Sequence, residues 1–441
     1  MLENFIENRI ISALPFQATT DQEAAIHSLA LFLSSQQERL SFLLSGYAGT
    51  GKTSIVSALV KALNGLRQPC VLLAPTGRAA KVMSHYSGFP AYTIHKWIYH
   101  YRPEQQEFSL GYNQAQNTLF VVDEASMIDT RLLRDLIQYV FQGQHCRLLL
   151  LGDEAQLPPV GYSESPALDI PTLQSFNLTL YTKRLTQVVR QAEQSGILRN
   201  ATILRERLEI TPSSDVCYLQ PSQVAEIIEQ SYREVGIEET LVITRSNRRT
   251  NLYNQGIRAQ ILWREDILQA GDRIMVSRNN YYWSLQYEGL PFLANGDMLE
   301  VTRIRNVREM YGYQFADVLL RSLDYEWEID AVVWLDTLVT ATPEESYNLQ
   351  RELFGLISED YPEIRNKKEL RDKVSASPYY NALQIRYAYA VTCHKAQGGQ
   401  WKRVIIDAGP SPEDLVPKDD LRWHYTALTR ATEQVYLLKN K

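Results

Sequence analysis

The sequence is poor in cysteine and has no long apolar run. The four cysteines are scattered and form no C-x-x-C pair: Cys70, Cys146, Cys217 and Cys393. This pattern favours reduced core residues over disulfides or zinc ligands, and it predicts a reducing, cytoplasmic location. No run of about 18 apolar residues occurs, so we expect no membrane-spanning helix. Residues 1–13 mix charged and apolar positions, which predicts an amphipathic helix and not a signal peptide.

The chain also lacks an excess of positive charge. Its 441 residues hold 45 Lys and Arg against 51 Asp and Glu, a formal net charge of −6. This excludes a protein coated in basic charge. It does not exclude a local basic channel, because nucleic-acid binding depends on where the charges lie. The length predicts about two to four domains.

One glycine-rich motif indicates that the chain binds a nucleotide. Residues 46–53 fit the phosphate-binding pattern G-x-x-x-x-G-K-[ST] at every fixed position, between an apolar run at 42–44 and a helical pattern at 54–63. Backbone N–H groups of such a loop wrap the phosphates of ATP, and the helix N-terminus adds its positive dipole end. We expect Lys52 to reach the β- and γ-phosphates, and Thr53 to place its hydroxyl on Mg²⁺. The expected nucleotide contacts from the loop are Gly46, Ala48, Gly49, Thr50, Gly51, Lys52 and Thr53.

A carboxylate pair follows a later apolar run. Residues 119–122 are continuously apolar, as in a strand buried on both faces of a parallel sheet, and Asp123 and Glu124 stand at its carboxyl end. We expect Asp123 to hold Mg²⁺ and Glu124 to polarise the water that attacks the γ-phosphate. Such a pair alone is more often a helix N-cap, and its place after a phosphate loop favours the catalytic interpretation. After another apolar run at 146–151, we expect Gln156 near the γ-phosphate, although this segment also reads as a Pro-rich loop.

Further short motifs follow in a fixed order. They are residues 18–22 (ATTDQ), 74–80 (APTGRAA), 92–95 (YTIH), 152–156 (GDEAQ), 185–191 (LTQVVRQ), 391–398 (VTCHKAQG) and 425–431 (YTALTRA). Single motifs of this length are unspecific, but their order and spacing leave little room for coincidence. Together with the phosphate loop, they resemble the motifs of superfamily 1 helicases, in the branch that includes the RecD and Dda helicases.

The resemblance covers most of the chain and implies further roles at the nucleotide. Gln22 matches the adenine-reading glutamine of the family, and Gly398 lies in the late motif that links DNA to ATP. Arg190 and Arg430 match two arginines that reach the phosphates from the second domain, so hydrolysis would depend on closure of a cleft. By itself, Arg190 would more often be a surface ion-pair residue.

The resemblance also implies a single-stranded DNA track. The matching side chains are small, polar or cationic and suit phosphate oxygens and sugars. They are Thr76, Arg78, His95, Thr392, His394 and Lys395. Without the resemblance, His394 and Lys395 would be read as a solvated turn.

Aromatic residues flank a Pro-containing turn between residues 97 and 117, which suits a β-hairpin. In the resembling helicases, a hairpin at this place is the pin that splits the duplex. Trp97 and Phe108 are candidates to stack on the base pair at the fork, with Tyr99 and Tyr101 beside them. For any one of them, packing of the hairpin onto its own domain is an equally good interpretation.

We therefore predict an α/β fold with two RecA-like P-loop domains in tandem, a β-hairpin pin insertion in the first and an SH3-like β-barrel insertion in the second. The first domain would span residues 1–175, with the pin at 97–117. The second would comprise residues 176–264 and 379–441, and the barrel with a helical arm would occupy 265–378.

The predicted function is that of a helicase that uses ATP and Mg²⁺, moves along single-stranded DNA and opens forked duplex DNA. Its 5′→3′ direction comes only from the resemblance. We expect a functional monomer that does not act at a membrane, and the residues indicate no protein partner. A translocase with little unwinding activity would carry the same motifs, and RNA stays open as a track. A small-molecule kinase would leave Arg190, His394 and Arg430 without roles, and a non-enzymatic strand-binding protein would not need Glu124.

Overall fold

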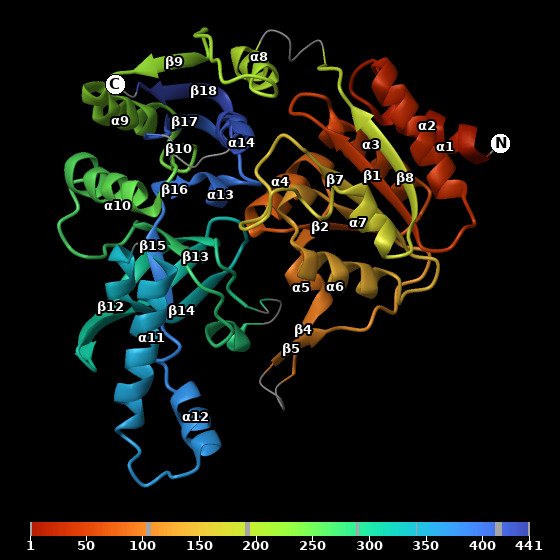
Figure 1. Ribbon diagram of the computed structural model, residues 1–441. Helices are drawn as coiled ribbons and strands as arrows, with labels where there is room; N and C mark the ends of the chain where they lie inside the picture. Colours follow the sequence, from red (N-terminus) through yellow and green to blue (C-terminus); the bar gives the residue numbers. More distant parts are fainter. Residues whose placement is uncertain are drawn as a thin grey trace. The chain divides into compact units, whose positions relative to one another are not determined.

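The computed structural model describes residues 2–102, 107–189, 195–287, 290, 292–340, 342–410 and 417–439 (Figure 1). Arg190 and the turn of the expected pin hairpin at 103–106 lie outside the described residues. Contacts divide the chain into two compact units. Unit 1 comprises Met1–Leu219, Ala396–Ile406 and Pro410–Lys441, and unit 2 comprises Gln220–Lys395 and Asp407–Gly409.

A six-stranded parallel sheet organises most of unit 1. Its order is β3-β2-β6-β7-β1-β8, and every neighbouring pair runs parallel. The strands are β1 (Leu40–Gly46), β2 (Cys70–Ala74), β3 (Ala91–Thr93), β6 (Leu119–Val122), β7 (Arg147–Gly152) and β8 (Thr179–Leu185). The helices are α1 (Leu2–Ala13), α2 (Thr20–Ser34), α3 (Lys52–Gly65), α4 (Gly77–Ser87), α5 (Ile94–Ile98), α6 (Thr130–Val140) and α7 (Ile170–Ser175), with a 3₁₀ turn at Ala125–Met127.

The sheet is buried on both faces because its strands are apolar at successive positions. Phe42 and Leu44 pack into one core with α1, α2 and α3, whereas Leu43, between them, packs into a second core with α6 (Figure 1). β6 alternates in the same way, which explains its continuous apolar run. The apolar runs at 42–44 and 119–122 lie in β1 and β6, and most of the run at 146–151 lies in β7.

The pin region holds a short helix and a hairpin. β4 (Tyr99–Arg102) and β5 (Glu107–Leu110) pair in antiparallel fashion. Trp97 lies in α5 and not in a hairpin strand, because Thr93 caps this helix by accepting a hydrogen bond from Lys96 N at 3.1 Å. The side chain of Phe108, in β5, lies outside the described part of the chain.

The rest of unit 1 comes largely from the end of the chain. β9 (Val216–Leu219), β18 (Ala431–Leu438) and β17 (Trp401–Asp407) run parallel, beside α8 (Gly196–Ile203) and α14 (Pro417–Leu428). β8 joins the first sheet although it lies beyond residue 175, where we expected the first domain to end. The domain boundaries themselves stay a prediction.

Unit 2 combines a parallel strand pair with a closed barrel. β10 (Thr240–Thr244) runs parallel to β16 (Ala390–Thr392), with α9 (Val224–Val235), α10 (Asn247–Gly256) and α13 (Cys393–Ala396) nearby in the chain. The barrel consists of β11 (Arg273–Val276), β12 (Met298–Met310), β13 (Tyr313–Ser322), β14 (Glu328–Trp334) and β15 (Leu383–Tyr387). Short 3₁₀ turns lie at Pro221–Gln223, Trp283–Gln286 and Leu335–Val339, and a π turn lies at Ile257–Ile261. The predicted barrel insertion is confirmed.

A helical arm, α11 (Pro343–Ser358) and α12 (Lys367–Ser375), extends from this barrel (Figure 1). Its base packs on the fully buried Trp334, which stacks on Phe315 with ring centroids 5.8 Å apart. Tyr313 Oη donates a 2.8 Å hydrogen bond to Glu352 in α11. The arm is therefore held on the barrel by aromatic packing and by a tyrosine–carboxylate bond. In the described part of the chain, no helix is long and apolar enough to cross a bilayer.

Candidate functional site

The phosphate-binding loop joins β1 to α3 at the carboxyl edge of the parallel sheet. Gly49 and Gly51 have φ values of 76° and 85°, which favour glycine. A Cβ atom at Gly51 would lie 2.3 Å from Gln22 Nε2, so a side chain here would have to displace the buried Gln22 amide. Lys52 begins α3, and its ammonium group donates hydrogen bonds to the carbonyl oxygens of Gly46 and Tyr47, the second at 3.0 Å. The loop thus has the backbone geometry that a phosphate cradle requires.

Asp123 and Glu124 stand at the end of β6, as predicted. Asp123 Oδ2 accepts a 2.6 Å hydrogen bond from Tyr86 Oη, and Oδ1 accepts one from Glu124 N at 2.8 Å. Burial and the neighbouring Asp123 raise the pKa of Tyr86 well above its usual value. Glu124 adopts the left-handed conformation with a φ of 51°, which costs a non-glycine residue about 1 kcal/mol or more. Such strain at a carboxylate beside a phosphate loop is typical of active sites.

Three side chains that are far apart in the sequence lie together here: the half-buried Glu124 and the buried Gln156 and Arg430. Arg430 Nη1 lies 3.7 Å from Glu124 Oε1, and Arg430 is 4% exposed. With its amide atoms assigned to satisfy both neighbours, Gln156 donates to Glu124 Oε2 at 3.1 Å and accepts from Arg430 Nη2 at 3.3 Å. Arg430 also donates to the carbonyl oxygens of Thr426 and Gly399, at 3.1 and 3.3 Å.

The surroundings of Glu124 shift the pKa of its carboxyl group. Burial raises the pKa of Glu124, and the positive charges of Arg430 and Lys52 only partly oppose that effect. A carboxylate whose pKa is moved toward neutrality is a better proton acceptor at neutral pH. The arrangement can therefore take a proton from a water molecule while Arg430 offsets negative charge nearby.

Gln22 is fully buried and ties α2 to the phosphate loop. Its Oε1 accepts from Thr19 N at 3.0 Å, which closes a capping box, and its Nε2 donates to Thr50 O at 3.0 Å. Next to it, Asp21 Oδ2 accepts hydrogen bonds from the backbone N–H groups of Thr186 and Gln187, and the first of these lowers the pKa of Asp21. Gln22 thus supports the loop, and its adenine-reading role stays a prediction.

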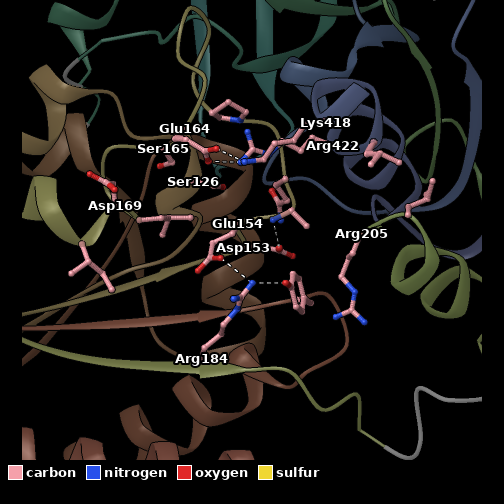
Figure 2. A pocket seen from close by; sticks show the side chains of 18 of the residues that line it. Ser126, Asp153, Glu154, Glu164, Ser165, Asp169, Arg184, Arg205, Lys418 and Arg422 are labelled. Atoms are coloured by element: carbon pink, nitrogen blue, oxygen red, sulfur yellow. Dashed lines mark hydrogen bonds and ion pairs between the residues drawn. The ribbon is translucent and has the colours of Figure 1, made fainter. Parts of the chain in front are cut away.

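A pocket of about 510 Å³ adjoins this site in unit 1 (Figure 2). Its wall carries opposed charges, with Arg184 Nη2 3.0 Å from Glu154 Oε2 and with Lys418 and Arg422 both directed at Glu164. Arg205 points away from these carboxylates and lies over the ring of Tyr47, 4.1 Å from its centroid. The sequence motifs did not single out Arg184, Arg205 or Arg422, because none of them lies in a motif with a spacing of its own.

Two of the predicted DNA contacts in unit 1, Thr76 and Arg78, lie at the start of α4. Thr76 caps this helix, and its Oγ1 accepts from Ala79 N at 3.2 Å. Arg78 lies over the ring of Trp401, 5.1 Å from its centroid, and donates to Gln400 O at 3.2 Å. Gly398 has a φ of 74°, and a Cβ atom there would lie 2.7 Å from the Ala79 Cβ, which accounts for the glycine. Thr76, Arg78 and Gly398 therefore lie together.

Two aromatic side chains of α5 contact neighbouring rings. The ring of Trp97 lies 5.0 Å from that of Tyr92, and the ring of His95 lies 5.5 Å from that of Tyr99. Burial lowers the pKa of His95, so its imidazole is neutral at neutral pH. Trp97 thus packs against Tyr92 and against the core of its own domain, and its role as a pin residue stays a prediction.

The predicted DNA contacts in unit 2 follow β16. Thr392 ends this strand, and His394 and Lys395 lie in α13. Lys395 Nζ donates a 2.6 Å hydrogen bond to Asn295 Oδ1, in the turn that leads into β12. Burial, reinforced by Arg386, lowers the pKa of Lys395 to about 8. Burial also lowers the pKa of His394, and Lys395 adds to this effect.

Residues 17–208 match the family model described as "AAA domain", and residues 387–438 match the "UvrD-like helicase C-terminal domain". The chain is 25% identical over 416 residues to the ATP-dependent RecD2 DNA helicase of Deinococcus radiodurans, covering 89% of this chain and 46% of that protein. These matches agree with the predicted likeness to the superfamily 1 helicases related to RecD and Dda. The AAA domain and the helicase relatives indicate an ATP hydrolase.

Two further relatives agree with that placement. The chain is 31% identical over 154 residues to the ATP-dependent DNA helicase Dda of Enterobacteria phage T4, covering 33% of this chain and 34% of that protein. The chain is also similar to a solved structure of a Pif1 helicase, from a study of DNA unwinding at forked double-stranded DNA. The TM-score of the two is 0.50 and their identity is 15%, and the match covers 96% of this chain and 92% of the Pif1 chain. This likeness confirms the predicted fold, with tandem RecA-like domains and a barrel insertion. The chain spans about half the length of RecD2.

Proposed function

We propose that this chain is an ATP-dependent DNA helicase that translocates 5′→3′ along single-stranded DNA and unwinds duplex DNA. The observation that carries the proposal is the cluster of Glu124, Gln156 and Arg430 beside a complete phosphate loop. A protein that only holds a strand has no use for a half-buried carboxylate with a raised pKa next to Lys52. The relatives RecD2 and Dda are named ATP-dependent DNA helicases, and the 5′→3′ direction rests on likeness to that branch.

The side chains divide the work of ATP hydrolysis. Lys52 holds the β- and γ-phosphates, and Glu124 accepts the proton of the attacking water. Gln156 keeps the Glu124 carboxylate in place through its 3.1 Å hydrogen bond, and Arg430 offsets charge on the transferred phosphoryl group. In this proposal, Arg190 supplies a second positive charge.

Mg²⁺ fits the same site. It is held in proteins by one or two carboxylates, hydroxyls and substrate phosphates, and the Asp123 carboxylate and the Thr53 hydroxyl are donors of that kind. Asp123 is fixed by hydrogen bonds from Tyr86 and from Glu124 N. When bound, the ion neutralises charge that develops on the phosphates.

The DNA strand is held by polar and cationic side chains from both units. In unit 1 these are Thr76, Arg78 and His95, and in unit 2 they are Thr392, His394 and Lys395. Contacts of this kind read the backbone and not the bases, so binding is independent of sequence and falls with salt. Trp97 and Phe108 would separate the duplex by stacking at the fork. One chain with two RecA-like domains acts as a monomer.

The test is ATP-dependent unwinding of two partial duplexes, one with a 5′ single-stranded tail and one with a 3′ tail. We expect only the 5′-tailed duplex to open. Opening of only the 3′-tailed duplex would keep the motor and overturn the direction. If neither opens while single-stranded DNA stimulates hydrolysis, the chain is a translocase with little unwinding activity. An RNA tail in place of DNA tests the track.

A matched pair of lysine variants controls the assignment of the site. Lys52→Ala is expected to abolish hydrolysis and spare DNA binding, because its ammonium is the phosphate contact. Lys61→Ala removes an exposed lysine from the same helix and is expected to leave hydrolysis unchanged. Retained hydrolysis in Lys52→Ala would show that the phosphate site is elsewhere.

A further inference from the structure

A tyrosine hydroxyl from α14 bridges two motifs of the nucleotide site. Tyr425 is 1% exposed, and its Oη accepts a 2.7 Å hydrogen bond from Ala48 N. The same hydroxyl donates a 2.6 Å hydrogen bond to Asp153 Oδ2. Ala48 belongs to the phosphate loop, and Asp153, labelled in Figure 2, follows β7. One side chain thus connects the loop that would hold ATP with the segment that carries Gln156.

The surroundings place this hydroxyl at the end of the site where the terminal phosphate of ATP would bind. Lys52 Nζ, the group expected to reach the β- and γ-phosphates, lies 4.0 Å from the Asp153 oxygen that Tyr425 contacts. The other oxygen of Asp153 accepts from Ala155 N at 3.0 Å. Both oxygens of Asp153 therefore have hydrogen-bond donors, and the carboxylate is held in one orientation.

A second contact joins α14 to the segment after β7 that carries Asp153 and Gln156. Leu157 N donates to Thr426 Oγ1 at 2.9 Å, and Thr426 O accepts from Arg430 Nε at 3.1 Å. Thr429 N donates to Tyr425 O at 3.0 Å, which continues the helical hydrogen bonding past the end of α14. A displacement of the Tyr425 ring would therefore reach Arg430 through a short, hydrogen-bonded stretch of backbone.

We propose that Tyr425 is a positioning residue whose hydroxyl competes with the terminal phosphate of ATP for the Ala48 N–H group, so that ATP binding is transmitted to α14 and Arg430. The inference rests on the proposed function and deepens it. An amide N–H makes one good hydrogen bond at a time, and a charged phosphate oxygen is a stronger acceptor than a neutral hydroxyl. ATP would thus take the N–H group and release the tyrosine. ADP, which lacks the terminal phosphate, would leave the tyrosine in place.

The test compares Tyr425→Phe with the wild-type protein by nucleotide binding in the absence of DNA. The variant keeps the ring and removes the competing hydroxyl. We expect it to bind a non-hydrolysable ATP analogue about fivefold more tightly, the worth of one neutral hydrogen bond, and to bind ADP with unchanged affinity. An equal change for both nucleotides, or no change for either, would overturn the proposal and leave Tyr425 as a structural support.

Tyr253→Phe is the matched control. Tyr253 Oη also donates to a buried carboxylate, Asp407 Oδ2 at 2.8 Å, but it lies in unit 2, whereas the phosphate loop lies in unit 1. We expect it to change neither affinity. A selective gain for the ATP analogue in Tyr253→Phe would contradict the role of Tyr425, because it would show that any such loss of a hydroxyl acts this way.

A second measurement does not depend on the stability of Tyr425→Phe. A fluorinated tyrosine placed only at position 425 reports the environment of the ring by its ¹⁹F resonance. We expect the ATP analogue to shift this resonance and ADP to leave it in place. The same spectrum with both nucleotides would overturn the proposal. Neither measurement needs hydrolysis or DNA, so an absence of DNA-stimulated hydrolysis would refute the proposed function alone.

Discussion

We predict that the charge of Lys395 makes DNA binding depend on pH. Its side chain is half-buried, and its ammonium donates a 2.6 Å hydrogen bond to Asn295 Oδ1; desolvation and Arg386 lower its pKa from 10.5 to about 8. Asp297 also faces this site, and burial raises its pKa to about 7. The lysine therefore loses its charge in a range where an ordinary surface lysine is fully charged.

The number of protons taken up on binding decides whether DNA affinity rises or falls with pH. A phosphate oxygen beside the ammonium favours the charged form and raises the pKa of Lys395 in the complex. The complex then holds more protons than the free protein, so affinity falls as pH rises through 8. If DNA raises this pKa by one unit, affinity falls about fivefold between pH 7 and pH 9, toward a limit of about tenfold or 1.4 kcal/mol. Ionised Asp297 opposes the loss by favouring the charged lysine.

The assay is the dissociation constant for single-stranded DNA at fixed ionic strength from pH 7 to pH 9, in the wild-type protein and in Lys395→Arg. Arginine keeps its charge throughout, so the variant should lack the part of the slope that Lys395 causes. His394, whose pKa is lowered by burial, titrates below this range and is present in both proteins. Identical slopes in the two proteins would refute a charged contact between Lys395 and the strand.

Three further predictions test other parts of the molecule. Glu124→Gln should lower kcat about 10²- to 10⁴-fold with nucleotide affinity nearly unchanged, because the amide cannot accept the proton of the attacking water. Steady-state hydrolysis and nucleotide titration measure the two effects, and an unchanged kcat would remove Glu124 from the mechanism. Trp97→Ala should reduce unwinding more than DNA-stimulated hydrolysis, and equal losses in the two assays would show a structural residue instead of a pin. Trp334→Ala should lower the free energy of unfolding, measured by denaturant titration, by about 3–5 kcal/mol, because this fully buried ring joins the arm to the barrel. The control Trp263→Ala, at a ring that is 80% exposed, should change the free energy of unfolding by less than about 0.5 kcal/mol.

Local patterns predicted the strands and the phosphate loop well. The continuous apolar run at 119–122 became β6 because each of its side chains faces one of the two cores of the sheet. The glycines at 49 and 51 adopt the left-handed conformations that the loop requires. The prediction for Trp97 was less accurate, since the capping residue Thr93 placed it in α5 and the aromatic pattern had pointed to a hairpin strand.

Sequence by itself determined the class of protein, the order of its motifs and the expectation that ATP is its ligand, because these depend on neighbouring residues and on periods of two or about 3.6. Only the tertiary structure decided which side chains meet. Tyr425 reaches Ala48 across 377 positions of the chain and Asp153 across 272, and no local pattern encodes such a pair. The raised pKa of Glu124 and the lowered pKa of Lys395 were likewise decided there, because desolvation depends on residues that folding brings from distant segments.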